Sequence, residues 1–177
     1  MSIGVNQIPE VLNEYNVYDD DTNVLIGISD SVTLAAMQLM TATISGAGIG
    51  GEYSAPVVGH WQSVQQEIPF RTLYKSVLQY MDHTKVAKFS LRGALQVTDK
   101  DTGTTSMVPI RYVVRGKTTE VNPGSAKPGD AMGASIKMEV LYMLLEIDGT
   151  KIIEADKLND VFSVNGTDLM DEVRSMC

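Results

Sequence analysis

A run of alternating side chains between residues 85 and 98 constrains this chain more than any other feature. The polar and charged side chains on one side include Lys88, Ser90, Arg92 and Gln96. A period of two is typical of a strand that buries one face and leaves the other in water. The run therefore predicts a half-buried strand that is longer than an ordinary one. The apolar side chains of the other face are Ala87, Phe89, Leu91, Leu95 and Val97.

The C-terminal half repeats this pattern. Alternation returns over 108–114, after a turn, and again over 136–145. The second of these runs is apolar on both sides near its end, which is typical of a central or interface strand. Asp148 and Gly149 predict a tight turn into a strand near 151–154. Further strands are predicted at 24–28, 32–44 and 57–67.

A glycine-rich segment separates two of the predicted strands. Gly46, Gly48 and Gly51 satisfy the spacing G-x-G-x-x-G. A dinucleotide site of this kind needs a helix to begin directly after the glycines, so that its N-terminus faces the pyrophosphate. The residues that follow favour a strand instead. We therefore predict an extended hairpin over 43–56, not a nucleotide loop.

One amphipathic helix is predicted after Pro69. Its apolar positions recur at the spacing of a single helix face, as Phe70, Leu73, Tyr74, Val77, Leu78 and Met81. A shorter helix is predicted near 168–176. The expected fold is a mainly β single domain over 1–177, a small β-sandwich or barrel with one flanking α-helix and a long Gly-rich hairpin. Residues 1–22 are predicted to form an N-terminal arm.

Composition restricts the function classes. Lys and Arg total 14 against 22 for Asp and Glu, a net charge of −8. This balance argues against a protein that grips nucleic acid by its phosphates. Cys177 is a single cysteine and forms no internal disulfide. No signal peptide and no apolar run of about 20 residues is present, so we expect no membrane anchor.

Catalytic patterns are absent from the sequence. His60 and His83 have no second ligand at metal-binding spacing. The run Asp19-Asp20-Asp21 lacks the spacing of a calcium loop. No nucleophile, phosphate-loop or zinc-protease motif occurs. Distances between carboxylates do not follow from a sequence, so paired-carboxylate catalysis is left unsupported. We predict neither enzymatic activity nor a cofactor.

The order of these features resembles a known family. It runs from the hairpin ISGAGIGGEYSAP through IPFRTLYKSVLQYM to VPIRYVVRGKTTEVNPGSAKPGD and LEIDGTKIIEADKLNDVFSVNG. From about residue 24 onward the chain is similar to the major tail tube proteins of contractile-tailed bacteriophages and of related phage-tail-like bacteriocins. The first 22 residues are less distinctive.

The resemblance implies a structural role, as a conduit for DNA or in the puncture of the target cell envelope. Subunits of this family form hexameric rings, in which the sheets of the subunits join into one ring-shaped barrel. The rings stack into a hollow tube inside a sheath. The implied partners are further copies of the chain, the tail sheath protein, baseplate and tail terminator proteins, and a tape measure protein in the lumen. The implied location is a virion tail or bacteriocin particle assembled in the bacterial cytoplasm. The implied contacts between rings and subunits are Ile44, Gly46, Gly48, Ile49, Gly51 and Tyr53.

Two other classes of protein fit parts of the pattern, a monomeric β-barrel that binds a small apolar ligand and an enzyme built on a β-sandwich. The hairpin and the two-sided apolar strand favour assembly. Edge strands are aggregation hazards, and closing a ring removes them. The polar face of the strand over 85–98, with Lys88, Ser90, Arg92 and Gln96, is a candidate for the lumen or an interface. The sequence does not distinguish the tail of a phage from a headless bacteriocin particle.

Overall fold

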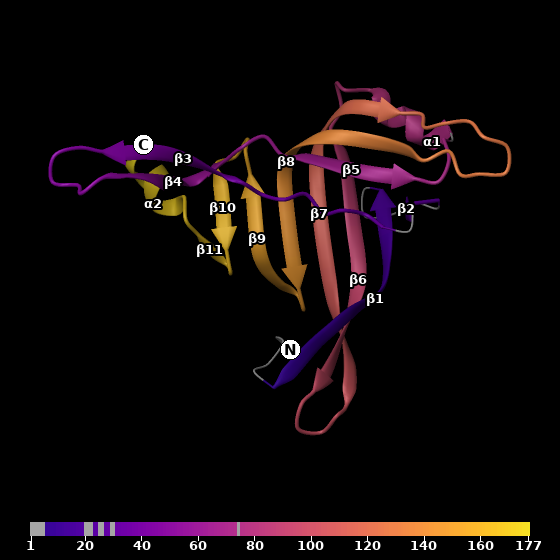
Figure 1. The fold of residues 1–177 in the computed structure, drawn as a ribbon, viewed down its shortest axis with the longest axis horizontal. Coiled ribbons are helices and arrows are strands. Elements are labelled where there is room, and N and C mark those ends of the chain that lie inside the picture. Colours follow the sequence, from indigo (N-terminus) through magenta and orange to yellow (C-terminus); the bar gives the residue numbers. More distant parts are fainter. Residues whose placement is uncertain (1–5, 20–22, 25–26, 29–30, 74) are drawn as a thin grey trace.

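The computed structural model describes residues 6–19, 23–24, 27–28, 31–73 and 75–177. Its main sheet is built from β1 (Gln7–Asp19), β2 (Asn23–Val24), β5 (Gln65–Phe70), β6 (Ala87–Asp99), β7 (Thr105–Asn122), β8 (Ala134–Ile147), β9 (Thr150–Asp156), β10 (Val161–Val164) and β11 (Thr167–Asp168). Within the described residues the order is β11-β10-β9-β8-β7-β6-β1-β2, with β5 beside β8, and the pairings are antiparallel. A separate two-stranded sheet, β3 (Leu39–Ser45) with β4 (Glu52–Trp61), projects to one side (Figure 1).

The main sheet bends where the pairing of β7 and β8 slips. The register shifts between Arg115 and Gly116, so that Leu141 of β8 is passed over. A Cβ on Gly116 would overlap the carbonyl oxygen of Glu139, so this close approach of two backbones requires glycine. Beyond the slip, β8 pairs with β5, and the upper parts of β7 and β8 turn sideways beside it (Figure 1). The sheet thereby folds into a small sandwich.

The core lies between these layers, on one face of the main sheet. Its most deeply buried side chains include Phe70 of β5 and Ile136, Met138 and Val140 of β8, each 0% exposed. The same cluster receives Val17, Trp61, Phe89, Leu91, Tyr112, Val114, Met143, Ala155, Phe162 and Met170. Strands from both halves of the chain therefore share one core, as expected for a single packed unit.

The prediction of a mainly β fold with a Gly-rich hairpin is confirmed. The alternating run is β6, with Phe89 and Leu91 buried in the core. The later runs are β7, β8 and β9. The tail helix is α2 (Asp171–Met176). Strict alternation over many residues predicted these elements well because a strand with one wet face has no other way to satisfy that pattern.

The prediction of a long amphipathic helix is wrong. Phe70 is instead the last residue of β5, opposite Ala134. The helical part is only α1 (Lys75–Leu78) and a 3₁₀ turn at Gln79–Met81. Pro69 is tolerated because β5 lies at the margin of the sheet, off the main strand order, where a missing N–H breaks no inner ladder.

The six side chains expected on that helix face do not form a stripe. Phe70 is buried and Leu73 is partly buried against the core. Leu78 and Met81 are exposed, at 44% and 57%. Tyr74 and the side chain of Val77 lie outside the described residues. The sequence pattern missed Tyr80, which is buried and packs on Phe89 with 4.9 Å between ring centroids. A helix of about two turns is too short to present a continuous apolar face.

The N-terminal segment also differs from its prediction. Residues 7–19 form β1 and pair along β6, with Gln7 opposite Asp99 and Asp19 opposite Phe89, rather than a separate arm. Register shifts follow Pro9 and Leu12, and such irregularities let a strand with a proline keep its pairing. Parts of 1–22 and of the strand predicted at 24–28 lie outside the described residues. Regular strand structure over 32–44 begins only at Leu39.

Residues 31–38 cross the body as an extended strap bound by a buried amide. Gln66 is 0% exposed, and its Nε2 donates to the carbonyl oxygens of Thr33 and Glu67 at 2.8 and 2.6 Å. Its Oε1 accepts from the backbone N–H of Ala35 at 2.9 Å and from the Tyr112 hydroxyl at 3.0 Å. Burial raises the pKa of Tyr112 to about 12, so this hydroxyl keeps its proton. Gln66 thus fixes the segment that leads into the hairpin.

Candidate assembly surface

The hairpin β3–β4 carries the residues predicted to contact other subunits. Ile44 lies opposite Tyr53, and Ser45 lies opposite Glu52. The tip at residues 46–51 is closed by a bond from the Ile49 N–H to the Gly46 carbonyl, at 3.1 Å. Figure 1 shows this tip at the far end of the molecule from α1. The structure therefore brings the six predicted contact residues together on one projection.

Apolar side chains on the hairpin face water in the isolated subunit. Ile49 is 40% exposed and Tyr53 is 55% exposed. Further exposed apolar residues on the same two strands are Leu39, Met40, Val57 and Val58. A two-stranded ribbon on its own is marginally stable in water. A ribbon with this much exposed apolar surface is typical of an interaction element.

The root of the hairpin is packed tightly against the C-terminal segment. Gly59 has φ +73, and a Cβ there would overlap the Met170 sulfur. Met170 is itself buried in the core. Trp61 lies two residues after Gly59 at the end of β4, and the Lys157 ammonium lies 4.2 Å from the centre of its ring. An isolated glycine within a strand pattern is the sequence signal for such a close approach; nothing in the sequence pointed to Met170.

Lys157 also belongs to a polar network beneath the hairpin. Its Nζ lies 2.9 Å from Glu139 Oε1, and the Ser63 hydroxyl donates to the other carboxylate oxygen at 2.6 Å. Burial by itself would raise the pKa of Glu139, but the hydrogen bonds from Ser63 and Lys157 hold it below its usual value. The network ties β8 to the linker between β4 and β5, and so fixes where the hairpin leaves the body.

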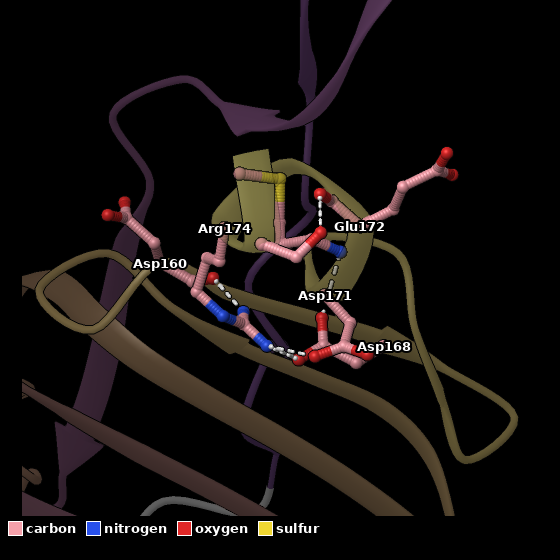
Figure 2. Close-up of polar contacts among 7 residues, drawn as sticks. Asp160, Asp168, Asp171, Glu172 and Arg174 are labelled. Atoms are coloured by element: carbon pink, nitrogen blue, oxygen red, sulfur yellow. Dashed lines mark hydrogen bonds and ion pairs between the residues drawn. The ribbon is translucent and has the colours of Figure 1, made fainter. Parts of the chain in front are cut away.

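The C-terminal segment is held in turn by Arg174 on α2 (Figure 2). Its guanidinium donates to the backbone carbonyl of Asp160 and to the carboxylate of Asp168, each at 2.7 Å. A longer contact of 3.4 Å reaches Asp171. The hydrogen bond from Arg174 is the main cause of the lowered pKa of Asp168. In Figure 2 the Glu172 carboxylate points away from this cluster.

Replacing Gly59 by Ala tests the packing at the hairpin root. We expect Gly59→Ala to lower the free energy of unfolding by about 1–3 kcal/mol more than Gly103→Ala does. Both glycines have a similar positive φ, +73 and +69, but nothing lies within 4 Å of a Cβ on Gly103. The pair of variants therefore separates backbone strain from the clash with Met170. Urea unfolding measures both, and equal losses would contradict the tight packing.

The outer edge of β1 is a second surface with open strand geometry. β1 pairs with β6 on one side and with β2 only at Tyr18 and Asp19 on the other. Among the described residues, no strand pairs with its outer edge between residues 8 and 14. Ile8, Val11 and Leu12 are 49%, 56% and 44% exposed. A long strand edge of this kind is a template for pairing with another chain.

The polar face of β6 lies opposite the core. Ser90 on this face is 0% exposed, whereas Lys88, Arg92 and Gln96 are half-buried. The face continues across β7 and β8, where Arg111 lies 3.6 Å from Glu146. The four residues predicted as a lumen or interface face are therefore together on one side of the sheet. Among the described residues, none of the four belongs to the core cluster.

The described residues form neither a metal site nor a clear pocket for a small apolar ligand. Among them, no group of three or more His, Cys, Asp or Glu side chains is placed to hold a metal ion. A surface hollow of about 400 Å³ is lined by Asp19, Gln79, Tyr80, Asp82, Lys85, Val86, Ala87 and Lys88. Half of these side chains are charged, which differs from the mainly apolar lining of a site for an apolar ligand. In the described part of the chain, no helix has the length and apolar character needed to cross a membrane.

Comparison with known proteins places these features in a family. The family model for phage tail tube protein FII matches residues 9–176. The tail tube protein of Escherichia phage P2 is 28% identical over 149 residues, which cover 84% of this chain and 86% of that protein. The major tail tube protein of Serratia phage KSP20 is 26% identical over 163 residues, covering 92% and 91%.

A solved structure shares the fold. It is the sheath/tube terminator of the PVC extracellular contractile injection system in its extended state. The TM-score is 0.56 at 11% identity, and the match covers 78% of this chain and 97% of that one. The resemblance to tail tube proteins of contractile-tailed phages is confirmed. Since the family pattern spans nearly the whole sequence, this chain belongs to the phage tail tube protein FII family.

Proposed function

We propose that this tail tube protein assembles into hexameric rings that stack into a hollow tube inside a contractile sheath. The observation that carries the proposal is the hairpin β3–β4, which projects from the body with exposed apolar side chains and pairs with no other strand among the described residues. An element of this kind becomes stable when a second surface covers it. A neighbouring ring of the same protein would supply that surface.

Within a ring, the sheets of neighbouring subunits join edge to edge. Two features support this arrangement, the outer edge of β1 and the short strands β10 and β11 at the other margin of the sheet. Pairing one margin with the other, copy after copy, closes a barrel and leaves no open edge. The isolated subunit is then one segment of a wall that other copies complete.

Between rings, the hairpin tip makes the stacking contact. The proposed contact residues are Ile44, Ile49 and Tyr53, with Gly46, Gly48 and Gly51 allowing the tip to fit closely. No atom lies within 4 Å of a Cβ built on these glycines, so the tip has room to receive a neighbour. The six residues act in assembly, and we assign them no catalytic role.

The polar face of β6 lines the lumen in this arrangement. The core lies on the opposite face of the sheet, whereas Lys88, Arg92 and Gln96 are partly exposed on this one and Ser90 is buried between them. The tube surrounds a tape measure protein, is capped by terminator and baseplate proteins, and is assembled in the bacterial cytoplasm before it becomes part of a particle. We propose a structural role without enzymatic activity; nothing favours the monomeric carrier.

Assembly of the purified protein tests this proposal. Concentrated protein should form rings and tubes that are visible by negative-stain microscopy and that sediment far faster than a 19.2 kDa monomer. The reaction should need neither nucleotide nor metal, so a chelator should leave it unchanged. Monomers that persist at high concentration, even with sheath and baseplate proteins added, would count against tube formation.

A further inference from the structure

We infer that the hairpin β3–β4 of one copy packs on a second apolar surface, in the lower part of the main sheet of the next copy. The inference rests on the proposed function and deepens it, because it names the surface that receives the hairpin. We call this receiving surface the lower apolar surface. It is formed by β1, β6, β7 and β8, through the side chains of Leu12, Leu95, Val97, Val108, Ile110 and Ile147.

The lower apolar surface continues the face of the sheet that carries the core. On β6, Leu95 and Val97 follow the core residue Leu91 at a period of two, so the three side chains point to the same face. Leu95 lies opposite Leu12 of β1 and opposite Val108 of β7. The apolar face therefore extends across neighbouring strands, beyond the place where the core ends.

Gly93 marks the middle of this surface. A Cβ on Gly93 would lie 2.8 Å from the Leu12 side chain and 3.3 Å from the Ile110 side chain. These two side chains therefore lie close to the strand between them. On the other side of β7, Ile110 lies opposite Ile147. The surface is thus continuous from β1 to β8.

The isolated subunit covers this surface only in part. Among the described residues, none of its six side chains belongs to the core cluster. Leu12 is 44% exposed, and Leu95, Ile110 and Ile147 are half-buried. An apolar face of this extent gains stability when a further layer removes it from water.

The hairpin carries an apolar face that fits such a layer. Ile44 lies opposite Tyr53 and Ala42 lies opposite Ala55, which places these four side chains on one face of the ribbon. The other face is mainly polar and carries Thr41, Thr43, Ser45, Glu52 and Ser54. Tyr53 is 55% exposed in the isolated subunit. The ribbon is therefore amphipathic, and its apolar face has room for a partner.

The two surfaces agree in size. The four strands β1, β6, β7 and β8 span about 14 Å at ~4.8 Å between neighbours. The paired positions of the hairpin from Thr41 to Ser45 extend over about 14 Å at ~3.4 Å per residue. A ribbon of this length can cross the four strands as a second sheet layer.

The positions of the two surfaces favour a second copy as the partner. Figure 1 shows the hairpin leaving the upper end of the main sheet, whereas the turn between β6 and β7 lies at the lower end. Two different surfaces at opposite ends make a head-to-tail contact, which repeats from copy to copy. Two lower apolar surfaces packed on each other would instead close a dimer that cannot grow. The repeating contact suits a member of a tail tube family.

Cross-linking between introduced cysteines tests the inference in the assembled protein. Cys177→Ser first removes the single cysteine of the chain. Tyr53→Cys is then combined with Leu12→Cys, Leu95→Cys or Ile110→Cys, in three separate variants. A bis-maleimide whose span matches the ~10 Å between packed sheets should join subunits of the tube into covalent chains in at least one variant.

A neighbouring residue on the hairpin is the matched control. Ser54 follows Tyr53 but lies on the polar face, so Ser54→Cys with the same partners should react at least about 10-fold more slowly. Urea midpoints equal to that of the Cys177→Ser protein show that each variant is folded. Leu12 is the most exposed of the three partner positions, so its replacement disturbs the subunit least.

The outcomes separate this inference from the proposed function. Tubes in which none of the three pairs reacts, or in which the Ser54 variants react as fast as the Tyr53 variants, would overturn the inference and leave the tube intact. Dimers cross-linked through Leu95→Cys alone would assign the surface to a closed pair and also overturn it. Covalent chains without tubes would support the contact and contradict the proposed function. Monomers that neither assemble nor react would contradict both.

Discussion

We expect subunits that carry Ile49→Asp to stay folded and to form no tubes. The Ile49 side chain lies at the tip of the hairpin, away from the core, and the bond from its backbone N–H to Gly46 does not depend on the side chain. In a stacked tube, however, the new carboxylate would be buried without a partner. That costs at least ~4 kcal/mol for each contact, which raises the concentration needed for assembly about 1,000-fold.

Circular dichroism and sedimentation measure the two halves of this prediction. The variant should keep the spectrum and the urea midpoint of the unmodified subunit and should sediment only as small species. Met81→Asp is the matched control, since Met81 is also exposed, at 57%, but lies at the end of the 3₁₀ turn after α1. It should assemble normally. Tubes of ordinary length from Ile49→Asp would contradict the role given to the hairpin tip.

Gln66→Leu should be the most destabilising of the single changes considered. Leucine has a similar volume, but it removes the four hydrogen bonds of the amide, those to the Thr33 and Glu67 carbonyls and those from the Ala35 N–H and the Tyr112 hydroxyl. The Ala35 N–H keeps only its 3.3 Å bond to the Tyr112 oxygen. Each hydrogen bond lost costs about 0.5–1.5 kcal/mol, and the buried Tyr112 hydroxyl is left without an acceptor. We therefore expect a loss of ~3 kcal/mol or more, which corresponds to a fall in Tm of about 10 °C for a chain of this size.

The neighbouring residue provides the control. Gln65 lies on the same strand but is exposed, so Gln65→Leu should change the free energy of unfolding by less than ~0.5 kcal/mol. Hydrogen exchange adds a local test. In Gln66→Leu, the amides of residues 31–38 should lose protection before those of β6 and β7, because the strap alone loses its anchor. Equal urea midpoints for the two variants would contradict the importance of this amide.

The sequence predicted best where one local pattern determined the structure. β6, β7 and β8 follow from alternation, because only one choice of faces buries Phe89 and exposes Lys88. The helix after Pro69 was mistaken because a strand end followed by a short helix can imitate the spacing of one helix face. Phe70 belongs to the strand and Leu78 to the helix. Periodicity cannot distinguish these cases over so few residues.

Contacts between distant segments were the part that the sequence did not reveal. Residues 1–22 were predicted to form an arm, yet pairing with β6 makes residues 7–19 a strand. Tertiary pairing outweighs local propensity here. Two other contacts join residues that share no local sequence pattern. Met170 packs on Gly59, and Arg174 donates a hydrogen bond to the carbonyl of Asp160. The hairpin itself was predicted from the sequence, whereas the contacts that hold its root and the C-terminal segment in place were not.

The packing of Met170 on Gly59 sets an order of events during synthesis. Gly59 leaves the ribosome 111 residues before Met170, by the difference 170 − 59. Until the later residue arrives, the root of the hairpin lacks one of its supports. We therefore expect the hairpin to reach its final packing only after the strands of the main sheet have been synthesised.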